Sequence, residues 1–472
     1  MKRKLFSLIF IVALCHTFNV WALTINSHIV LERTYHHNPE AQSIKLDKDI
    51  SMEDLRESQA QYDTFLSGQL YYEKDKSERS IPVMGTNTSA ANYNFGIRQL
   101  IPSGTEFTAG FYNSRATSDS AFSAAAALYD SRFYFSLKQP LLNNMFGYQN
   151  RKNVSLAKQG VKTTQTSIQA SLQGLAYKNL SSYWTWYLYK KLEYISHDAL
   201  GAAERLHRTN RQKMDIGLIE ETDIYAFAAN VDIKKAELLD VLSKAATSES
   251  QLRVAIDLPD AILKLGKQKL SFGKLPSTGI MIDQAKNTNP EFLTHKNTLK
   301  AQNIIVAMKK NARLPQIDLT TSLTLNGIDP TYATAFTDIS NGNPIWTGGI
   351  EVTYPLQNRQ ARANYNKEKY KQAQALFSLK NMENKIIATI KNGYKKYRSA
   401  RSRMYVVATA VQHQKLKWEG EVKKYDQGRS DPDVVIRYQN DYLDTKKLYA
   451  QSVFDYAMSR LELDSIRGLL KP

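Results

Sequence analysis

Residues 316–325 and 346–354, which read QIDLTTSLTL and WTGGIEVTY, decide the fold class of this 472-residue chain. Apolar and polar side chains alternate along both stretches, which is typical of β-strands with one apolar and one polar face. Pro315 and Pro355 bound the pair, as expected where a ladder of strands stops. Each stretch has about the nine to eleven residues that cross a lipid bilayer at a tilt. The pattern therefore predicts strands long enough to span a membrane.

A helical period replaces the strand period on both sides of this hairpin. Between residues 150 and 211 there is no proline, and apolar residues recur at every third or fourth position. Such a helix would be roughly 95 Å long at 1.5 Å per residue. That length exceeds an ordinary globular helix several-fold, which indicates a coiled coil or a helical barrel. Further helices are predicted over residues 222–256, 360–424 and 433–470.

The chain contains a long internal duplication. Three short patterns recur in the same order: Asn-Pro-Glu at 38–40 and 289–291, Pro-Leu-x-Asn at 140–143 and 355–358, and Lys-x-Asp-x-Gly at 213–217 and 424–428. We therefore predict two repeats, 23–256 and 289–472, joined by a connector over 257–288. Each repeat holds a helix, strands and a long helical hairpin that turns at a glycine, and two such copies together build one structural unit.

The first repeat carries more strand material than the second. Its strands are predicted over about 65–139, whereas the second repeat has only the hairpin at about 316–354. Pro39 to Pro140 is 101 residues and Pro290 to Pro355 is 65, so the surplus of 36 is about one hairpin. Residues 93–112, turning at 102–104, are the candidate for it. The sequence leaves open whether this hairpin joins the other strands or folds beside them.

The N-terminus and the composition restrict the function. Residues 1–22 are predicted to be a secretory signal peptide, because three cations at 2–4 precede an apolar run at 5–14 and Ala22 ends a suitable cleavage site. The formal net charge of +18 favours anionic partners, but export excludes cytosolic nucleic acid as a partner. The mean hydropathy of −0.44 argues against a bundle of transmembrane helices.

Signals for an enzyme are absent from the sequence. The one cysteine, Cys15, excludes a disulfide framework and any metal site built on cysteines. There is no His-Glu-x-x-His motif, no phosphate-binding glycine loop and no Gly-x-Ser-x-Gly elbow. We therefore expect no catalysis, no metal and no cofactor.

The strands are too few to close a roomy pore from one chain, and open strand edges leave backbone groups unpaired in lipid. Several chains must therefore combine. With its signal peptide, duplication, strands, long helices and paired glycine turns, the sequence resembles the TolC family of outer-membrane efflux and secretion ducts. The turns that carry the resemblance are Ile216-Gly217-Leu218-Ile219 with Thr222-Asp223-Ile224, and Tyr425-Asp426-Gln427-Gly428.

The resemblance covers nearly the whole mature chain and implies an α+β membrane protein. It implies a homotrimer that shares one transmembrane β-barrel in the outer membrane, in contact with its lipid, and a long α-helical barrel in the periplasm. It also implies that the trimer binds a periplasmic adaptor protein and an inner-membrane transporter of the RND or ABC class. The expected function is a passive exit duct, in a tripartite efflux pump or a type I secretion system, for small toxic molecules or secreted protein.

The resemblance assigns roles to residues at the two turns. Gly217 and Gly428 would form the periplasmic tips on which the adaptor docks; the alternative is that they only end their helices. Asp223 and Tyr425 occupy the positions of a lock in which hydrogen bonds keep the entrance narrow. The alternative for Asp223 is a favourable interaction with the N-terminus of its own helix.

Two arginines near the second tip depart from the pattern of the family. Arg429 lies one residue before the place of the lock arginine, which is Ser430 here. Arg437 stands where some members carry an entrance aspartate, so it would favour anions if it faces the lumen. A solvated helix surface is the alternative reading of Arg437.

A second class of function remains open from the residues alone. A non-transporting coiled-coil envelope spacer, or a surface adhesin anchored by a small β-barrel, would also carry strands and long helices. The duplication favours the duct, because a hollow tapered tube needs helices that run down and return, whereas a spacer needs only one helical run.

Overall fold

The computed structural model describes residues 22–78, 81, 83, 87–120, 125–267, 275–341 and 344–471. The chain divides into two compact units. The helical unit combines the chain up to Ile44 with Ala170–Asn289 and the chain from Ile386 onward, and the sheet unit combines Lys45–Gln169 with Pro290–Lys385. The predicted signal peptide, residues 1–22, lies outside the described residues except for Ala22.

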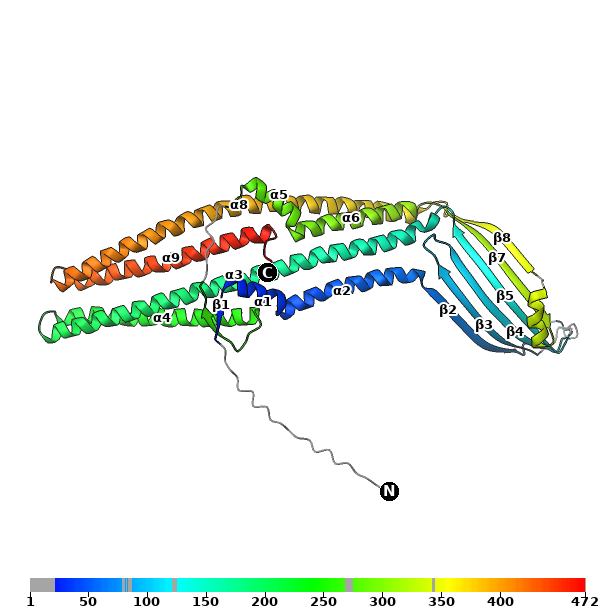
Figure 1. Cartoon of the computed structure of the whole chain (residues 1–472), viewed down its shortest axis with the longest axis horizontal. Helices are drawn as coiled ribbons and strands as arrows, with labels where there is room; N and C mark the ends of the chain where they lie inside the picture. Colours follow the sequence, from blue (N-terminus) through cyan, green and yellow to red (C-terminus); the bar gives the residue numbers. More distant parts are fainter. Residues whose placement is uncertain are drawn as a thin grey trace, which may run out of the picture. The chain divides into compact units, whose positions relative to one another are not determined.

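Two pairs of long helices have matched lengths. Helices α3 (Tyr148–Asp215) and α8 (Arg359–Asp426) have 68 residues each, and α4 (Glu221–Ala255) and α9 (Pro432–Ile466) have 35 each. The later member of each pair begins 211 residues after the earlier one (359 − 148 and 432 − 221). In the helical unit α4 runs beside α3, and α9 runs beside α8 (Figure 1). Helices α3 and α4 therefore form one helical hairpin, and α8 and α9 form a second hairpin of the same helix lengths.

An asparagine closes the second arm of each hairpin. Four shorter helices are α1 (Ser27–His36), α2 (Pro39–Gln59), α5 (Thr278–Thr288) and α6 (Pro290–Asn311). Between α1 and α2, the Asn38 side chain donates to the carbonyl of Ala255 at 2.9 Å. Between α5 and α6, Asn289 donates to the carbonyl of Ile466 at 2.9 Å. The two Asn-Pro-Glu patterns thus have the same structural role. In each, the asparagine donates to a carbonyl at a helix end, and the proline begins the next helix.

The largest core of the helical unit surrounds the middle of α3. Tyr183 and Trp186 are fully buried there, together with Leu252 of α4. A parallel strand pair, β1 (Ala22–Ile25) and β6 (Ile262–Leu265), packs against this core. The predicted connector over 257–288 therefore contains a strand and helix α5.

The helices of the described residues include none that is both long enough and apolar enough to cross a membrane.

The sheet unit is built on six antiparallel strands in the order β2-β3-β4-β5-β7-β8 (Figure 1). Their bounds are β2 Thr64–Asp75, β3 Thr88–Leu100, β4 Glu106–Ser118, β5 Ala127–Pro140, β7 Gln316–Asp329 and β8 Pro344–Thr353. The surplus hairpin of the first repeat is β3–β4, and it lies inside the sheet. Its turn is tight because Gly104 adopts φ +79° and a Cβ there would lie 2.6 Å from the amide nitrogen of Gly147.

The pairing separates the side chains into two faces. Residues paired across strands point to the same side of a sheet, and neighbours along a strand point to opposite sides. One cross-strand row reads Leu66, Ile97, Ala109, Phe135, Leu323 and Trp346. The row displaced by one residue reads Phe65, Arg98, Thr108, Ser136, Ser322 and Thr347. We call the sides that carry these rows the apolar face and the polar face.

A short helix lies between strands β7 and β8. Strand β7 continues to Asp329, and α7 (Tyr332–Asp338) and the 3-10 turn η4 (Ile339–Asn341) follow it. Ala335 is fully buried against the apolar face, where a Cβ at Gly327 would lie 2.1 Å from the Ala335 carbonyl oxygen. The absence of a side chain at Gly327 therefore allows α7 to lie directly on the sheet.

Candidate functional site

The two predicted tips have the same backbone geometry. At the first, the amide of Gly217 donates to Met214 at 2.8 Å and the amide of Leu218 donates to Lys213 at 2.9 Å. At the second, Gly428 and Arg429 donate to the carbonyls that lie three and five residues earlier, both at 2.9 Å. This is the Schellman pattern of a helix C-terminus, and it needs a left-handed residue. Gly217 (φ +76°) and Gly428 (φ +70°) supply that conformation.

A cluster with members from all four long helices lies just behind the tips. Tyr425 of α8 is 7% exposed, and its hydroxyl donates to Oδ1 of Asn210 of α3 at 2.6 Å. The edge of its ring meets Phe227 of α4, with 6.2 Å between the centroids, and Val435 of α9 completes the core. Lys213 places its ammonium 4.7 Å from the centroid of the Tyr425 ring and 3.2 Å from Asp426. We call these side chains the tip cluster.

The tip cluster keeps the phenol of Tyr425 protonated. Burial, and then the negative charges of Asp223 and Asp426, raise the pKa of Tyr425 to about 12. The hydroxyl is therefore a hydrogen-bond donor at any physiological pH. Since its acceptor lies on α3, the bond ties the end of α8, in the second repeat, to the end of α3, in the first repeat.

The acceptor of this bond is a residue that the sequence analysis did not single out. The resemblance matched Tyr425 with Asp223 as members of a lock, and that pairing between protomers stays a prediction. Within this chain the Tyr425 hydroxyl donates to Asn210. Asp223 is close enough to act on Tyr425 through its charge. It also stands in the first turn of α4, where an acidic residue favours the helix N-terminus. Asn210 was missed, although it is a polar residue, fully buried, in the last turns of a long helix.

The two arginines of the second tip are accessible to solvent in the single chain. Arg429 and Arg437 are both exposed. Ser430, which replaces the expected arginine, donates to Glu421 at 2.7 Å, and Lys424 donates to the other oxygen of the same carboxylate at 3.1 Å. These two hydrogen bonds, that of Ser430 first, lower the pKa of Glu421. Around the second tip, a serine–glutamate–lysine contact thus takes the place in which the family pattern has an arginine.

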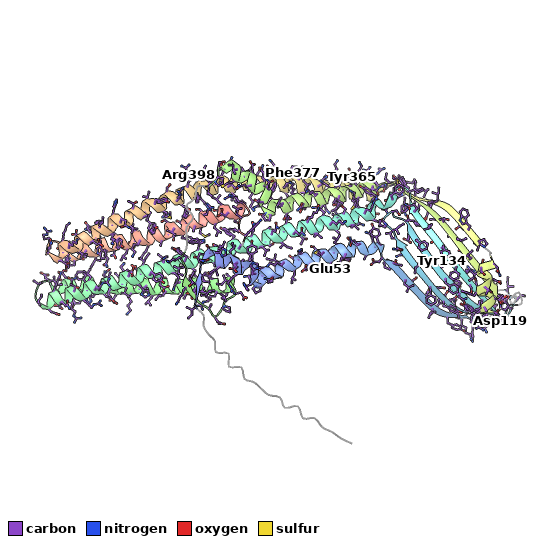
Figure 2. The ribbon with its side chains drawn as sticks, viewed as in Figure 1. Glu53, Asp119, Tyr134, Tyr365, Phe377 and Arg398 are labelled. Carbon is purple, nitrogen blue, oxygen red and sulfur yellow. The ribbon has the colours of Figure 1, made fainter. Side chains whose placement is uncertain are left out.

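The polar face of the sheet carries a tyrosine and an ion pair. Tyr134, labelled in Figure 2, lies over two glycines, since a Cβ at Gly110 would be 2.5 Å from its ring and one at Gly96 would be 3.0 Å from its hydroxyl. Lys138 pairs with the buried Asp318 at 2.9 Å. Because Gly96 and Gly110 have no side chains, Tyr134 can lie against the strands. The Lys138–Asp318 pair lies on the same face of the sheet. In the part of the chain that the structure describes, no group of three or more His, Cys, Asp or Glu side chains is arranged to hold a metal ion.

Comparison with known proteins identifies the architecture. No protein-family model matches the chain. The outer membrane efflux protein BepC of Brucella suis biovar 1 (strain 1330) is 23% identical over 332 residues, which are 69% of this chain and 71% of BepC. The outer-membrane channel CmeC of Campylobacter jejuni has a TM-score of 0.69 at 15% identity, over 94% of this chain and 85% of CmeC. The MtrE outer-membrane channel of Neisseria gonorrhoeae, solved in its open state, has a TM-score of 0.71 at 14% identity, over 94% and 89%.

The chain has the fold of the TolC-like channels.

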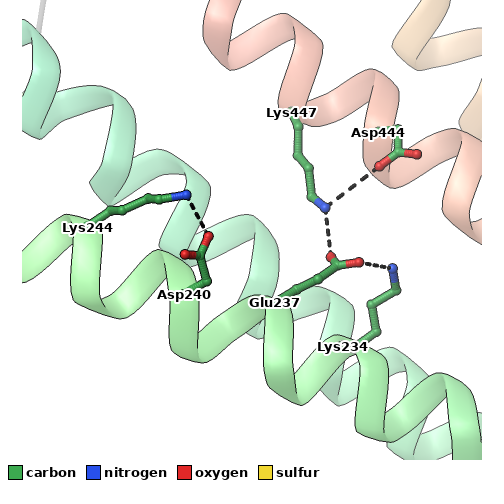
Figure 3. A network of polar contacts seen from close by, with 6 residues as sticks. All are labelled: Lys234, Glu237, Asp240, Lys244, Asp444 and Lys447. Carbon is green, nitrogen blue, oxygen red and sulfur yellow. Dashed lines mark hydrogen bonds and ion pairs between the residues drawn. The ribbon is translucent and has the colours of Figure 1, made fainter.

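In this TolC-like fold a second polar network joins the two hairpins, away from the tip cluster (Figure 3). Glu237 of α4 accepts from Lys447 of α9 at 2.8 Å and from Lys234 at 3.0 Å. Lys447 also lies 3.7 Å from Asp444. Lys234 is only 5% exposed, and Glu237 supplies the ion pair that a buried ammonium group needs. Burial raises the pKa of Glu237, but the hydrogen bonds from the two lysines outweigh it, and the pKa is lowered overall.

This network makes the contact between the hairpins sensitive to acid. Because the pKa of Glu237 is lower in the folded than in the unfolded chain, its ionised form stabilises the fold above the unfolded value of about 4.3. That stabilisation is lost as the pH falls through the lower folded pKa. We expect the melting temperature of the wild type to fall more steeply between about pH 5 and pH 3 than that of Glu237→Gln.

Circular dichroism at a series of pH values measures this difference. Asp240→Asn is the matched control, because Asp240 pairs with Lys244 at 2.7 Å but both side chains are more than half exposed (61% and 52%). An exposed pair contributes little, so this variant should follow the wild type. Equal acid slopes for Glu237→Gln and the wild type would contradict the prediction.

Proposed function

We propose that this protein is the outer-membrane channel of a tripartite efflux pump, an exit duct that performs no chemistry. The observation that carries the proposal is the six-stranded sheet, which has one apolar face, one polar face and two open edges. A sheet of this kind suits a wall between lipid and water. The TolC-like fold and the similarity to BepC, a protein named for efflux, support the same reading. A type I secretion duct for polypeptides is the nearest variant of this function.

The open edges favour assembly into a closed ring. Strand β2 runs away from α2 and β8 runs back toward α8, so β8 of one copy would lie antiparallel to β2 of the next. Closing the ring would satisfy backbone groups that lipid cannot. Three copies of six strands give eighteen, and barrels of about 16–18 strands leave an aqueous channel.

We therefore expect a homotrimer. Light scattering of the detergent-solubilised protein, corrected for bound detergent, should give three times the mass of the mature chain. A monomeric mass under non-denaturing conditions would contradict the shared barrel.

The helical hairpins would form the periplasmic part of the duct, with the tips toward the partners. Ile216 and Leu218, on either side of Gly217, are 72% and 67% exposed. An apolar pair displayed on a turn is costly to leave in water and is suited to burial by a partner. We assign these tips to the docking of a periplasmic adaptor, which would connect the channel to an inner-membrane transporter of the RND or ABC class.

Conductance separates this proposal from the alternative. The purified protein, inserted into planar bilayers, should give discrete ionic current steps, and a strain that lacks it should become more sensitive to toxic small molecules. A barrel that never conducts, with normal assembly, would instead favour the envelope spacer or adhesin. Loss of a secreted polypeptide without a change in drug sensitivity would favour the secretion duct.

A further inference from the structure

An exposed cation stands on the apolar face of the sheet. The row near the end at which β2, β4 and β7 finish reads Tyr72, Ala91, Arg115, Tyr129 and Asp329. Arg115 is exposed, and it belongs to the same face as the rows of leucine and phenylalanine. We call the end of the strands at which it lies the distal edge. An arginine on a lipid-facing surface is costly unless an anion or water meets it.

Tyrosines surround this arginine. The guanidinium carbon of Arg115 lies 5.9 Å from the centroid of the Tyr129 ring, and the ring of Tyr332, from α7, meets Tyr129 at 5.8 Å. Tyr93, one row below, is the diagonal neighbour of Arg115 across β3 and β4. Among the described residues, none of the ion pairs within 4.0 Å involves Arg115. Cation–π contact leaves the N–H groups of a guanidinium free to bind an anion.

An apolar hollow lies on the same face, farther from the distal edge. Its volume is about 290 Å³, and aromatic rings dominate its lining, with Phe95, Phe111, Phe133 and Phe135 among them.

 The ring of Phe336 of α7 packs against those of Phe111 and Phe133, with 5.9 and 6.2 Å between centroids, so α7 lies beside the hollow. From Phe111 to Arg115 is four residues, or about 13 Å along the strand.

We propose that Arg115 and its tyrosines bind the phosphate of a lipid in the outer leaflet, and that an acyl chain of this lipid occupies the apolar hollow. The proposal rests on the proposed function, because it needs the apolar face to lie in a membrane with the distal edge outward. A phosphate would accept hydrogen bonds from the guanidinium and from the tyrosine hydroxyls. The phosphate of the lipid would thus lie at Arg115 on the distal edge, and its acyl chain would lie in the hollow on the same face.

A merely structural role for Arg115 gives a different expectation. In that case the stacking on Tyr129 would be the whole contact, and the chemistry of the headgroup would not matter. The phosphate proposal predicts that a lipid with a phosphorylated headgroup is retained and that its dephosphorylated form is not. The two readings therefore differ in a binding measurement that does not depend on stability.

Native mass spectrometry of the assembled full-length mature protein, with added lipid A or dephosphorylated lipid A, tests this. Charge-assisted hydrogen bonds of ordinary strength correspond to about tenfold or more in affinity. We expect the wild type to bind lipid A at least about tenfold more tightly than the dephosphorylated form. Arg115→Gln should abolish that preference, and Arg115→Lys should keep part of it. Arg98→Gln, an exposed arginine of the polar face, should behave as the wild type.

Three outcomes would overturn the proposal: equal binding of the two lipids, a preference that survives Arg115→Gln, or an equal loss in Arg98→Gln. The current through planar bilayers keeps this test apart from the test of function. A wild type that conducts but shows no preference for phosphorylated lipid refutes the lipid site alone. A wild type that never conducts refutes the channel on which the site rests.

Discussion

The variant Tyr425→Phe should open the assembled channel at rest and raise its mean conductance several-fold. The hydroxyl of Tyr425 ties α8 to α3 through Asn210, and opening would have to separate the ends of these helices. Removing the hydroxyl costs the hydrogen bond and leaves the buried carbonyl oxygen of Asn210 without this donor. Such a loss is typically about 1–3 kcal/mol.

Three copies make the effect large. Moving a two-state balance from 1:99 to 99:1 takes about 5.5 kcal/mol, and three losses of this size in a trimer reach that scale. The phenyl ring keeps its contact with Phe227 and with the ammonium of Lys213. The trimer should therefore form normally. Single-channel recording measures the open fraction, and uptake of a large antibiotic such as vancomycin reports it in cells.

Two variants separate this bond from its surroundings. Tyr225→Phe is the matched control, since Tyr225 is also near the tip but is 65% exposed and donates only to Glu221, at 3.3 Å. It should leave the conductance unchanged. Asp223→Ala should have a smaller effect than Tyr425→Phe, because Asp223 acts on Tyr425 only through its charge within one chain. A large effect of Asp223→Ala with none of Tyr425→Phe would show that a contact of Asp223 holds the tip.

Features that depend on neighbours in the sequence were predictable. The ends of the long helices lie within four residues of the predicted ends. They were predictable because an apolar period of three to four residues without proline is a local property of the sequence. The glycine turns were predictable for the same reason. Gly217 and Gly428 directly follow helical stretches, and each needs a left-handed conformation that other residues adopt at a cost.

Features that depend on contacts between residues far apart in the sequence were not predictable. Asn210 and Tyr425 are 215 residues apart, and no periodicity relates them. The short helix α7 had a signal that was missed, since Tyr332, Ala335, Phe336 and Ile339 are spaced as one helical face. Its stability nevertheless depends on Gly327 and on the apolar face beneath it. The place of the extra hairpin was open because alternation predicts a strand but not the strand beside it.

That hairpin should set the width of the exit. Deleting residues 79–120 removes β3 and β4 and leaves β2 and β5, which run in opposite directions and so can pair. Leu66 and Phe135 belong to one cross-strand row of the apolar face, separated by one residue from each deleted strand. Without β3 and β4, the same register would pair Leu66 directly with Phe135. A trimer would then have twelve strands (three times four) in place of eighteen.

The deletion should reduce the current through the barrel by about half. The diameter of a barrel grows roughly in proportion to its strand number, so its cross-section should fall to about (12/18)², or roughly 0.4, of the original. The measurement belongs in the Tyr425→Phe background, because a closed tip would otherwise limit the current in both proteins. Single-channel conductance of trimers purified by size gives the ratio.

A smaller deletion, residues 79–86, is the control, because it shortens the connection between β2 and β3 but retains all six strands. It should conduct as the parent does. If the larger deletion forms trimers whose conductance equals that of the parent, the extra hairpin does not widen the lumen, and the narrowest part of the duct lies among the helices. A reduced current in the larger deletion alone would show that the surplus of the first repeat enlarges the pore, and that each repeat contributes to its circumference according to its number of strands.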